Sequence, residues 1–370
     1  AERFRHDWQR KHVPALVAAS RLLGDASTRL SSNARDQRQA STSSDGAGTA
    51  TAMGLAGASP SAGTRVLTHR AENTRASMEA QLASLQEALR KEEQSARTSP
   101  VEFGKGVMPF MTTDAERLKE RIGVLDALLS PGRTYLTFSD SPGDNRIIEV
   151  MGDITSAKHV IVHVPGISTD LDDYRNGNHD ATALLRAAQD KYGDDVAVIS
   201  FLYYNVPTGQ LADHKVPDLG EAASLAGAKS GEASLRDLVH ELSTDGRQVS
   251  VVAHSYGTVV VGQAMQHGLD ADRVVVLGSP GMGAQDRASL GSPDVHLIAG
   301  SSPVDPWAVG APDVWGKAQA LGDPVTYSPT FGPNPIEYAD HVDVTGAHGH
   351  SEYFTGRPLE NIVAAALGSR

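Results

Sequence analysis

From residue 134 onward, the chain alternates short apolar runs, rich in Val, Ile and Leu, with stretches of helical character. Turn residues such as Gly, Pro, Asp and Asn separate the two kinds of segment. Short and fully apolar strands that alternate with helices are typical of a parallel sheet buried on both faces. This pattern predicts an α/β fold in which helices cover a mostly parallel central sheet.

The predicted strands and helices follow one another closely. Residues 135–140 and 146–154 flank the turn sequence SPGDN, so we predict an antiparallel hairpin there. Further strands are predicted within 159–166, 196–204, 249–255, 273–281, 295–300 and, more weakly, 341–346. The helices between them are predicted at 181–190, 232–242 and 257–267.

The first part of the chain has a different composition. Residues 1–130 lack runs of β-branched residues and are rich in Ala, Gln, Arg, Glu and Ser. We therefore divide the chain into an N-terminal helical region, 1–130, and an α/β domain, 131–370. Within the first, a Ser-, Gly-, Ala- and Thr-rich tract at 41–63 has no periodicity, which is typical of a low-complexity connection.

Three helices are predicted in this N-terminal region. The first lies within residues 12–27 and ends at Gly24 and Asp25, and the last begins at Thr113 or Asp114 as N-cap and ends before Pro131. Between them, within 64–96, apolar residues recur at steps of four, three and four, which places them on one helix face. They are Met78, Leu82, Leu85 and Leu89.

The most informative segment is residues 253–257, which follow the pattern small-x-Ser-x-Gly between an apolar strand and a small-residue helix. In such a strand-to-helix turn the serine backbone is strained, and bulky side chains two positions away would collide with neighbouring elements. We predict that Ser255 is a nucleophile at the carboxyl edge of the sheet, with the amide of Tyr256 facing a developing oxyanion. The alternative interpretation is a serine that caps the helix.

A serine nucleophile on this kind of turn needs an acid and a histidine, which follow it in that order along the chain. Asp305 comes shortly after the predicted strand 295–300, on a proline-flanked loop. We predict that it orients the histidine. Asp313 and Asp323 are its rivals, and each of the three is alternatively a solvated loop carboxylate.

The histidine is expected on a loop after the last strand, where the sequence offers His341, His348 and His350. His341 comes too early. Glycines flank the other two, so spacing alone does not choose between them. We favour His350 as the base and keep His348 as the alternative.

A second oxyanion donor is expected after the strand that precedes the first crossover helix. The sequence HVPGISTD occupies that place, and Gly166 would allow a close approach of the backbone. We predict the amide of Ile167 as the donor. The alternative is that Pro165 and Gly166 only form a turn.

Composition narrows the classes of partner. The 370 residues include 33 Lys and Arg against 45 Asp and Glu, a formal charge of −12, which argues against nucleic acid because phosphate binding needs clustered cations. There is no cysteine, which excludes disulfides, thiol nucleophiles and Cys-ligated metal sites. At 40% hydrophobic residues, the chain can bury a sizeable core.

Cofactors and a membrane anchor are not expected. No apolar run approaches the roughly 18 residues that span a bilayer, and no phosphate loop or dinucleotide fingerprint occurs. His163, Asp170, Asp172 and Asp173 lack the tight spacing of metal ligands, so we expect no metal. The chain begins with Ala, which leaves open a cleaved leader with secretion, or a trimmed cytoplasmic protein; the oligomeric state is open as well.

Several longer segments carry a family resemblance. They are HVIVHVPGISTDLDDY, VVAHSYGTVVVG, VVVLGSPGMG, the pair Asp305-Pro306, FGPNP and HSEYF followed by LENI. Over residues 136–367 the chain thereby resembles an actinobacterial α/β-hydrolase family long catalogued as a domain of unknown function. Members usually show His-Ser-x-Tyr near the C-terminus, so the resemblance implies a triad of Ser255, Asp305 and His350.

Two positions depart from that family. Ala253 stands where Gly is typical, and Asn205 stands where Asp is usual, which would change the polarity of the pocket. The family's substrates are poorly defined, so the resemblance implies a reaction class rather than a substrate.

The leading hypothesis is a carboxylic ester hydrolase, with lipid or other acyl esters as candidate substrates. His350 would take the proton of Ser255, the alkoxide would attack a carbonyl, Asp305 would hold the imidazole tautomer, and water would hydrolyse the acyl-enzyme. A peptidase or acyltransferase with the same triad is one alternative. A noncatalytic binding module on a hydrolase scaffold is the other.

Overall fold

The computed structural model describes residues 61–98, 114–141, 144–166, 174–175, 177–204, 209–211, 214–216, 225–302, 327–328 and 331–368. All of them lie in one compact unit, Ser59–Arg370. The predicted first helix, 12–27, and nearly all of the tract at 41–63 lie outside the described residues. The predicted boundary between residues 130 and 131 stays a prediction.

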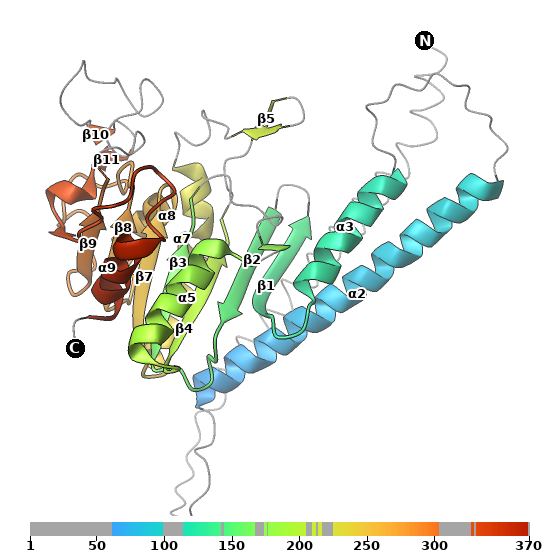
Figure 1. The fold of residues 1–370 in the computed structure, drawn as a ribbon, viewed down its shortest axis with the longest axis horizontal. Coiled ribbons are helices and arrows are strands. Elements are labelled where there is room, and N and C mark those ends of the chain that lie inside the picture. Colours follow the sequence, from blue (N-terminus) through green and yellow to red (C-terminus); the bar gives the residue numbers. More distant parts are fainter. Residues whose placement is uncertain are drawn as a thin grey trace, which may run out of the picture. The chain divides into compact units, whose positions relative to one another are not determined.

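An eight-stranded sheet forms the centre of this unit (Figure 1). In spatial order its strands are β1 (Thr134–Ser141), β2 (Asp144–Met151), β4 (Val196–Leu202), β3 (His159–Val164), β7 (Gln248–His254), β8 (Arg273–Leu277), β9 (His296–Gly300) and β12 (Asp340–His341). The pairs β1–β2 and β2–β4 are antiparallel, and all other neighbours are parallel. The predicted fold class, a mostly parallel sheet covered by helices, is confirmed.

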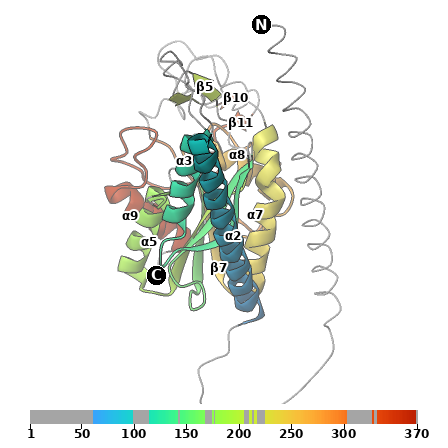
Figure 2. The same ribbon diagram turned by 90° about the vertical axis from the view of Figure 1, so that its right-hand side faces the viewer.

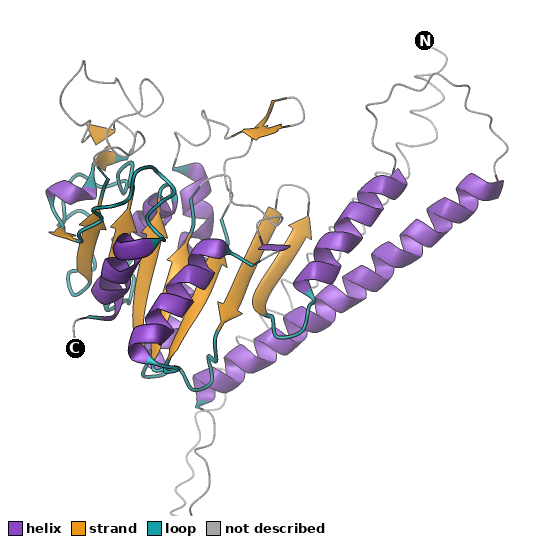
Figure 3. Cartoon of the chain, viewed as in Figure 1, coloured by secondary structure: helices purple, strands orange, loops and turns teal. Residues whose placement is uncertain are grey.

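Helices cover both faces of the sheet (Figures 1 and 3). On one face lie α5 (His179–Tyr192) and α9 (Gly356–Leu367), and on the other α7 (Ala226–Thr244) and α8 (Gly257–Gln266). Side chains alternate between the two layers along each strand. In β3, Val160, Val162 and Val164 join the α7–α8 core, whereas Ile161 joins the α5–α9 core. The central strands are therefore apolar on both faces, as the continuous apolar runs predicted.

The last strand is shorter than predicted. Of residues 341–346 only His341 is in β12, which pairs with β9 through Asp340 and His341 alone. Val342 and Val344 are buried in the α5–α9 core instead. Alternating apolar residues thus reflect packing under a helix here, because the backbone leaves the sheet after two residues. Shorter elements are β5 (Gly209–Leu211) with β6 (His214–Val216), β10 (Tyr327–Ser328) with β11 (Gly332–Pro333), and the 3-10 helix η1 (Pro335–Glu337).

Two helices lie beside each other along the β1 edge, α2 (Ala62–Thr98) and α3 (Asp114–Leu128) (Figures 1 and 2). On α2, Met78 and Leu85 are buried and Leu82 packs against the core, as predicted, whereas Leu89, the fourth residue of the predicted apolar face, is only partly buried. Leu125 and Leu128 of α3 are fully buried in the same core. The two helices therefore belong to the compact unit that contains the sheet.

A polar cluster fixes the start of α2 to the turn before β7. Asp245 accepts hydrogen bonds from Ser61 Oγ (2.6 Å) and from the amide of Gly63 (3.2 Å). Arg247 pairs with Asp245 and donates to Thr64 Oγ1 at 2.6 Å. Burial alone would raise the pKa of Asp245, but the Ser61 hydrogen bond, the Arg247 charge and the Gly63 amide together hold it below its ordinary value.

Among the described helices, none combines the length and the apolar character that crossing a membrane requires.

Candidate active site

Ser255 occupies a strained turn between β7 and α8. Its φ is +53°, a left-handed conformation that non-glycine residues rarely adopt. The Ser255 amide donates to the carbonyl of Leu277 at 2.9 Å, and the amide and hydroxyl of Thr258 both donate to the Ser255 carbonyl. Because hydrogen bonds hold the backbone on both sides of the side chain, the direction in which the Ser255 side chain leaves the turn is fixed.

Small residues around this turn allow the end of β3 to approach it closely. A Cβ on Gly257 would lie 2.4 Å from the carbonyl oxygens of Val164 and Pro165. A Cβ on Gly166 would lie 2.8 Å from Ser255 Cβ and 3.2 Å from its hydroxyl oxygen. Side chains at either glycine would therefore separate the β3 loop from the serine.

The structure brings His350 to Ser255. His350 Nε2 lies 2.8 Å from Ser255 Oγ, the distance of a hydrogen bond. The side chain of His348 is exposed, and its amide donates to Glu352 Oε2. His341 is also exposed, with Nε2 2.8 Å from the carbonyl of Ile336. Neither of the other two histidines predicted as candidates makes this contact.

Two of the predicted site residues, Asp305 and Ile167, lie outside the described residues, as do Asp313 and Asp323. The described part of the β9 loop nevertheless contacts the loop of His350. Ser302 Oγ donates to the carbonyl of Ala347 at 2.6 Å, and the Ser302 amide donates to the hydroxyl of Tyr353 at 3.0 Å. The segment that leads to residue 305 therefore starts beside the histidine loop.

Tyr256 immediately follows the nucleophile candidate and precedes the first turn of α8. Its side chain is 1% exposed, and its hydroxyl accepts a hydrogen bond from the amide of Ala228 at 3.0 Å. The ring anchors the residue in the core, so the backbone at the N-terminus of α8 is held in place. Backbone amides and the helix dipole at such an end favour negative charge.

Two residues near Ser255 have contacts that the sequence pattern did not predict. Tyr204, which follows β4, is buried and donates its hydroxyl to the carbonyl of Pro165 and, at 3.3 Å, to that of Gly166. Burial, together with nearby tyrosines, raises its pKa well above the ordinary value, so the hydroxyl keeps its proton. His254 lies at the end of β7, with Nε2 2.6 Å from the carbonyl oxygen of His350.

His163, for which the sequence predicted no role as a metal ligand, lies in β3. It is fully buried, neither ring nitrogen has a hydrogen-bond partner, and burial lowers its pKa to about 3. Asp170, Asp172 and Asp173 lie outside the described residues. Within the described ranges, no group of three or more His, Asp and Glu side chains is arranged to hold a metal ion.

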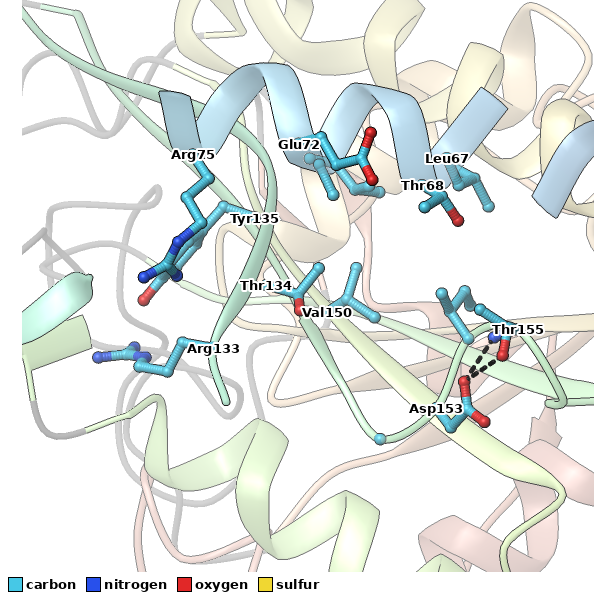
Figure 4. Close-up of a pocket in the computed structure, with 14 residues that line it drawn as sticks. Leu67, Thr68, Glu72, Arg75, Arg133, Thr134, Tyr135, Val150, Asp153 and Thr155 are labelled. Atoms are coloured by element: carbon cyan, nitrogen blue, oxygen red, sulfur yellow. Dashed lines mark hydrogen bonds between the residues drawn. The ribbon is translucent and has the colours of Figure 1, made fainter. Parts of the chain in front are cut away.

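A cavity of about 310 Å³ lies between α2 and the β1–β2 hairpin, away from Ser255 and His350 (Figure 4). Figure 4 shows Arg75, Arg133 and Tyr135 gathered at one end. Arg133 is already engaged there, because it forms a two-point ion pair with Glu149, at 2.7 and 2.9 Å, and donates to the backbone. This end of the cavity therefore serves to hold segments together.

A comparison with protein families agrees with the fold class. Residues 140–313, which include Ser255 but end before His350, match a family model described as "Alpha/beta hydrolase". An uncharacterized protein of Mycobacterium tuberculosis is 31% identical over 191 residues, which cover 48% of this chain and 28% of that protein. One of Mycobacterium bovis is 26% identical over 199 residues, covering 50% of this chain and 72% of that protein.

The chain thus spans only about a quarter of the length of the first of these relatives. Among solved structures, an alpha-beta serine hydrolase homologue from Coxiella burnetii is similar at 11% identity and a TM-score of 0.36, covering 65% of this chain and 98% of that one. The esterase domain of a Rhodothermus marinus protein is similar at 12% identity and a TM-score of 0.33, covering 64% and 95%.

Proposed function

We propose that the protein is a serine hydrolase that cleaves carboxylic esters, from the premise that residues 140–313 match the α/β-hydrolase family model. The observation that carries the proposal is the 2.8 Å contact between His350 Nε2 and Ser255 Oγ at a turn with positive φ. A nucleophile and a base within hydrogen-bond reach are the minimum for covalent acyl transfer. The strained turn supports the same role, because strain of this kind concentrates at functional sites.

The reaction would proceed through an acyl-enzyme. His350 Nε2 takes the proton of Ser255 Oγ while this oxygen forms a bond to the ester carbonyl carbon. The tetrahedral intermediate collapses as the protonated His350 gives its proton to the leaving alcohol, and the carbon–oxygen bond to that alcohol breaks. Water then attacks the acyl carbon while His350 accepts its proton. The bond from this carbon to Ser255 Oγ breaks, His350 returns the proton to Ser255 Oγ, and the carboxylic acid leaves. Asp305 holds the imidazole in the required tautomer throughout.

We assign the oxyanion to two backbone amides, those of Tyr256 and Ile167. For Tyr256, the position at the start of α8 supports this assignment, because amides there face outward from the helix and favour negative charge. For Ile167, the support is the close approach of Gly166 to Ser255 and the hydrogen bond from Tyr204 to the Gly166 carbonyl. A fixed Gly166 carbonyl constrains the peptide plane that it shares with the next amide.

For the substrate we propose an ester with an uncharged acyl group, and lipid or other acyl esters as the candidate class. The formal charge of −12 disfavours anionic substrates through long-range repulsion. The preferred length of the acyl chain can be measured with a series of esters that differ only in this length.

The test is hydrolysis of p-nitrophenyl esters of increasing acyl length by the wild type, Ser255→Ala and Ser156→Ala. Ser156 is an exposed serine before β3, at the opposite end of the strands from Ser255, and serves as the matched control. We expect Ser255→Ala to lose activity by roughly 10⁴-fold or more and Ser156→Ala to retain it. Equal activity of Ser255→Ala and wild type, or a wild type inactive on every ester, would contradict the proposal.

A further inference from the structure

We propose that His254 is a positioning residue for His350, an inference that rests on the proposed function. His254 Nε2 lies 2.6 Å from the carbonyl oxygen of His350. A carbonyl oxygen can only accept, so Nε2 carries the proton of this hydrogen bond. His350 Nε2 contacts Ser255 Oγ. The last residue of β7, His254, therefore holds the backbone of His350, and the next residue, Ser255, contacts its ring.

The ring of His254 also supports that of His350 by packing. Their centroids are 4.6 Å apart with an interplanar angle of 42°, and His254 further contacts Tyr353 at 5.6 Å and Phe354 at 6.0 Å. These separations lie within the range of favourable aromatic contacts. His254 is only 9% exposed, so the hydrogen bond and the stack are largely shielded from water.

This support matters because the predicted base is carried on a loop and not on a helix or strand. It leaves the sheet after the two-residue strand β12 and contains Gly346, with φ at +109°, and Gly349. An acid acting on the ring can set the tautomer and the rotation of the imidazole, but not the position of the backbone from which the ring extends. A displacement of about 1 Å from a productive geometry costs on the order of 100-fold in rate. The His254 hydrogen bond restrains that backbone directly, in addition to the contacts that Ala347 and Tyr353 make in the same loop.

Tyr353 extends the same support to the β9 loop. Its hydroxyl accepts from the amide of Ser302, and its ring contacts His254. His254 therefore lies at the meeting point of the nucleophile turn, the histidine loop and the start of the loop predicted to carry the acid. We assign His254 a role through His350, because its hydrogen bond is to the backbone of the predicted base and its ring packs against that of the base.

The test compares His254→Gln, which keeps a side-chain N–H donor near the position of Nε2, with His254→Met, which keeps volume but has no donor. His163→Met is the matched control, because His163 is a buried histidine of the neighbouring strand without a hydrogen-bond partner. Three properties of the 370-residue protein are measured. They are kcat and KM on the best p-nitrophenyl ester, the melting temperature, and the NMR signals of the His350 ring.

We expect His254→Met to lower kcat by about 10- to 100-fold with KM changed less than about twofold, and to shift the His350 ring signals. His254→Gln should recover kcat to within about fivefold of wild type and leave those signals near their wild-type positions. His163→Met should leave kcat unchanged, and any shift of the His350 signals should be smaller than in His254→Met, because His163 reaches this cluster only through Phe354. This pattern supports a positioning role.

Three results would overturn it. One is wild-type kcat in His254→Met. Another is an equal loss of kcat in both His254 variants that follows their loss of thermal stability, which would assign the residue to packing alone. The third is an unchanged His350 ring spectrum in His254→Met. A wild type without esterase activity would contradict the proposed function alone, because the NMR comparison still decides whether His254 positions His350.

Discussion

Two regions of this molecule are held together by different means. Around Ser255, backbone meets backbone: the carbonyls of Val164 and Pro165 lie where a side chain on Gly257 would be. Helix α2 is attached mainly through side chains, with apolar residues such as Met78 in the core and the charged cluster around Asp245 at the turn before β7. Proton transfer requires positions accurate to fractions of an ångström, whereas attachment of a helix tolerates adjustment. Close packing of backbone segments thus fixes the position of Ser255, whereas side chains that can adjust attach α2 to the rest of the unit.

The largest effect is expected where the backbones meet. Gly166→Ala would place a methyl group 2.8 Å from Ser255 Cβ, which forces the β3 loop away from the nucleophile. We expect kcat for ester hydrolysis to fall by roughly 10²- to 10³-fold, the cost of losing the oxyanion donor proposed at Ile167, while the melting temperature changes little. A variant with full activity would show that the β3 loop does not need to lie against Ser255.

At the attachment of α2, Asp245→Ala should act on stability and leave the activity of the folded protein intact. The substitution removes the partner of Arg247, whose side chain is 6% exposed, and an unpaired buried charge costs about 3 kcal/mol. Urea titration at neutral pH measures this loss. Reduced kcat in fully folded Asp245→Ala would mean that α2 and the active site are coupled.

The lowered pKa of Asp245 predicts that the free energy of unfolding depends on pH. Because the folded-state pKa of Asp245 is lowered, its contribution is complete above the unfolded value of about 3.9 and disappears as pH falls through the lower folded value. The free-energy difference between wild type and Asp245→Ala should therefore shrink below about pH 4. A difference that stays constant down to acid unfolding would contradict the assignment.

Tyr204→Phe probes the backbone region with a smaller change. It removes the hydroxyl that donates to the carbonyls of Pro165 and Gly166 but keeps the ring. We expect kcat to fall about tenfold with KM nearly unchanged, the cost of roughly one hydrogen bond. Tyr192→Phe is the matched control, because its hydroxyl also donates to a backbone carbonyl, that of Gly368, far along the chain from Ser255. Equal effects of both substitutions on kcat would remove the special role of Tyr204.

The smallest effect, and one of opposite sign, is expected in α3. A Cβ on Gly123 would meet only the end of the flexible Arg175 side chain, at 3.3 Å. Gly123→Ala should therefore stabilise the protein by about 0.5 to 1 kcal/mol through helix propensity, without changing kcat. If Gly123→Ala in α3 lowered kcat as much as Gly166→Ala, the two regions would not differ in their tolerance of substitutions.

The elements that the sequence predicted well are local. The nucleophile turn follows from a strand, a serine and a small-residue helix within about 20 residues, and the apolar face of α2 follows from spacing. The predicted length of the last strand was wrong, because burial of Val342 and Val344 under helices produces the same alternation of apolar and polar residues as a strand. Periodicity alone cannot separate the two.

Contacts between distant residues could not be predicted in this way. His254 meets the backbone of a residue 96 positions later, and Tyr204 meets Pro165 across 39 positions. Both contacts depend on strand order, which brings β7 beside β3 and the C-terminal loop over their ends. Between His348 and His350, glycine-flanked spacing gave no choice, and the resemblance favoured His350. Asp305 and Ile167 stay predictions.

The most direct test of Ser255 and His350 acting together is covalent labelling by a fluorophosphonate, followed by mass spectrometry of the modified peptide. We expect one adduct, on Ser255, in the wild type and none in Ser255→Ala. His350→Ala should slow labelling by about 100-fold or more, while His348→Ala, at an exposed histidine two residues away, should label at the wild-type rate. Labelling of another serine, or equal rates for the two histidine variants, would contradict the account.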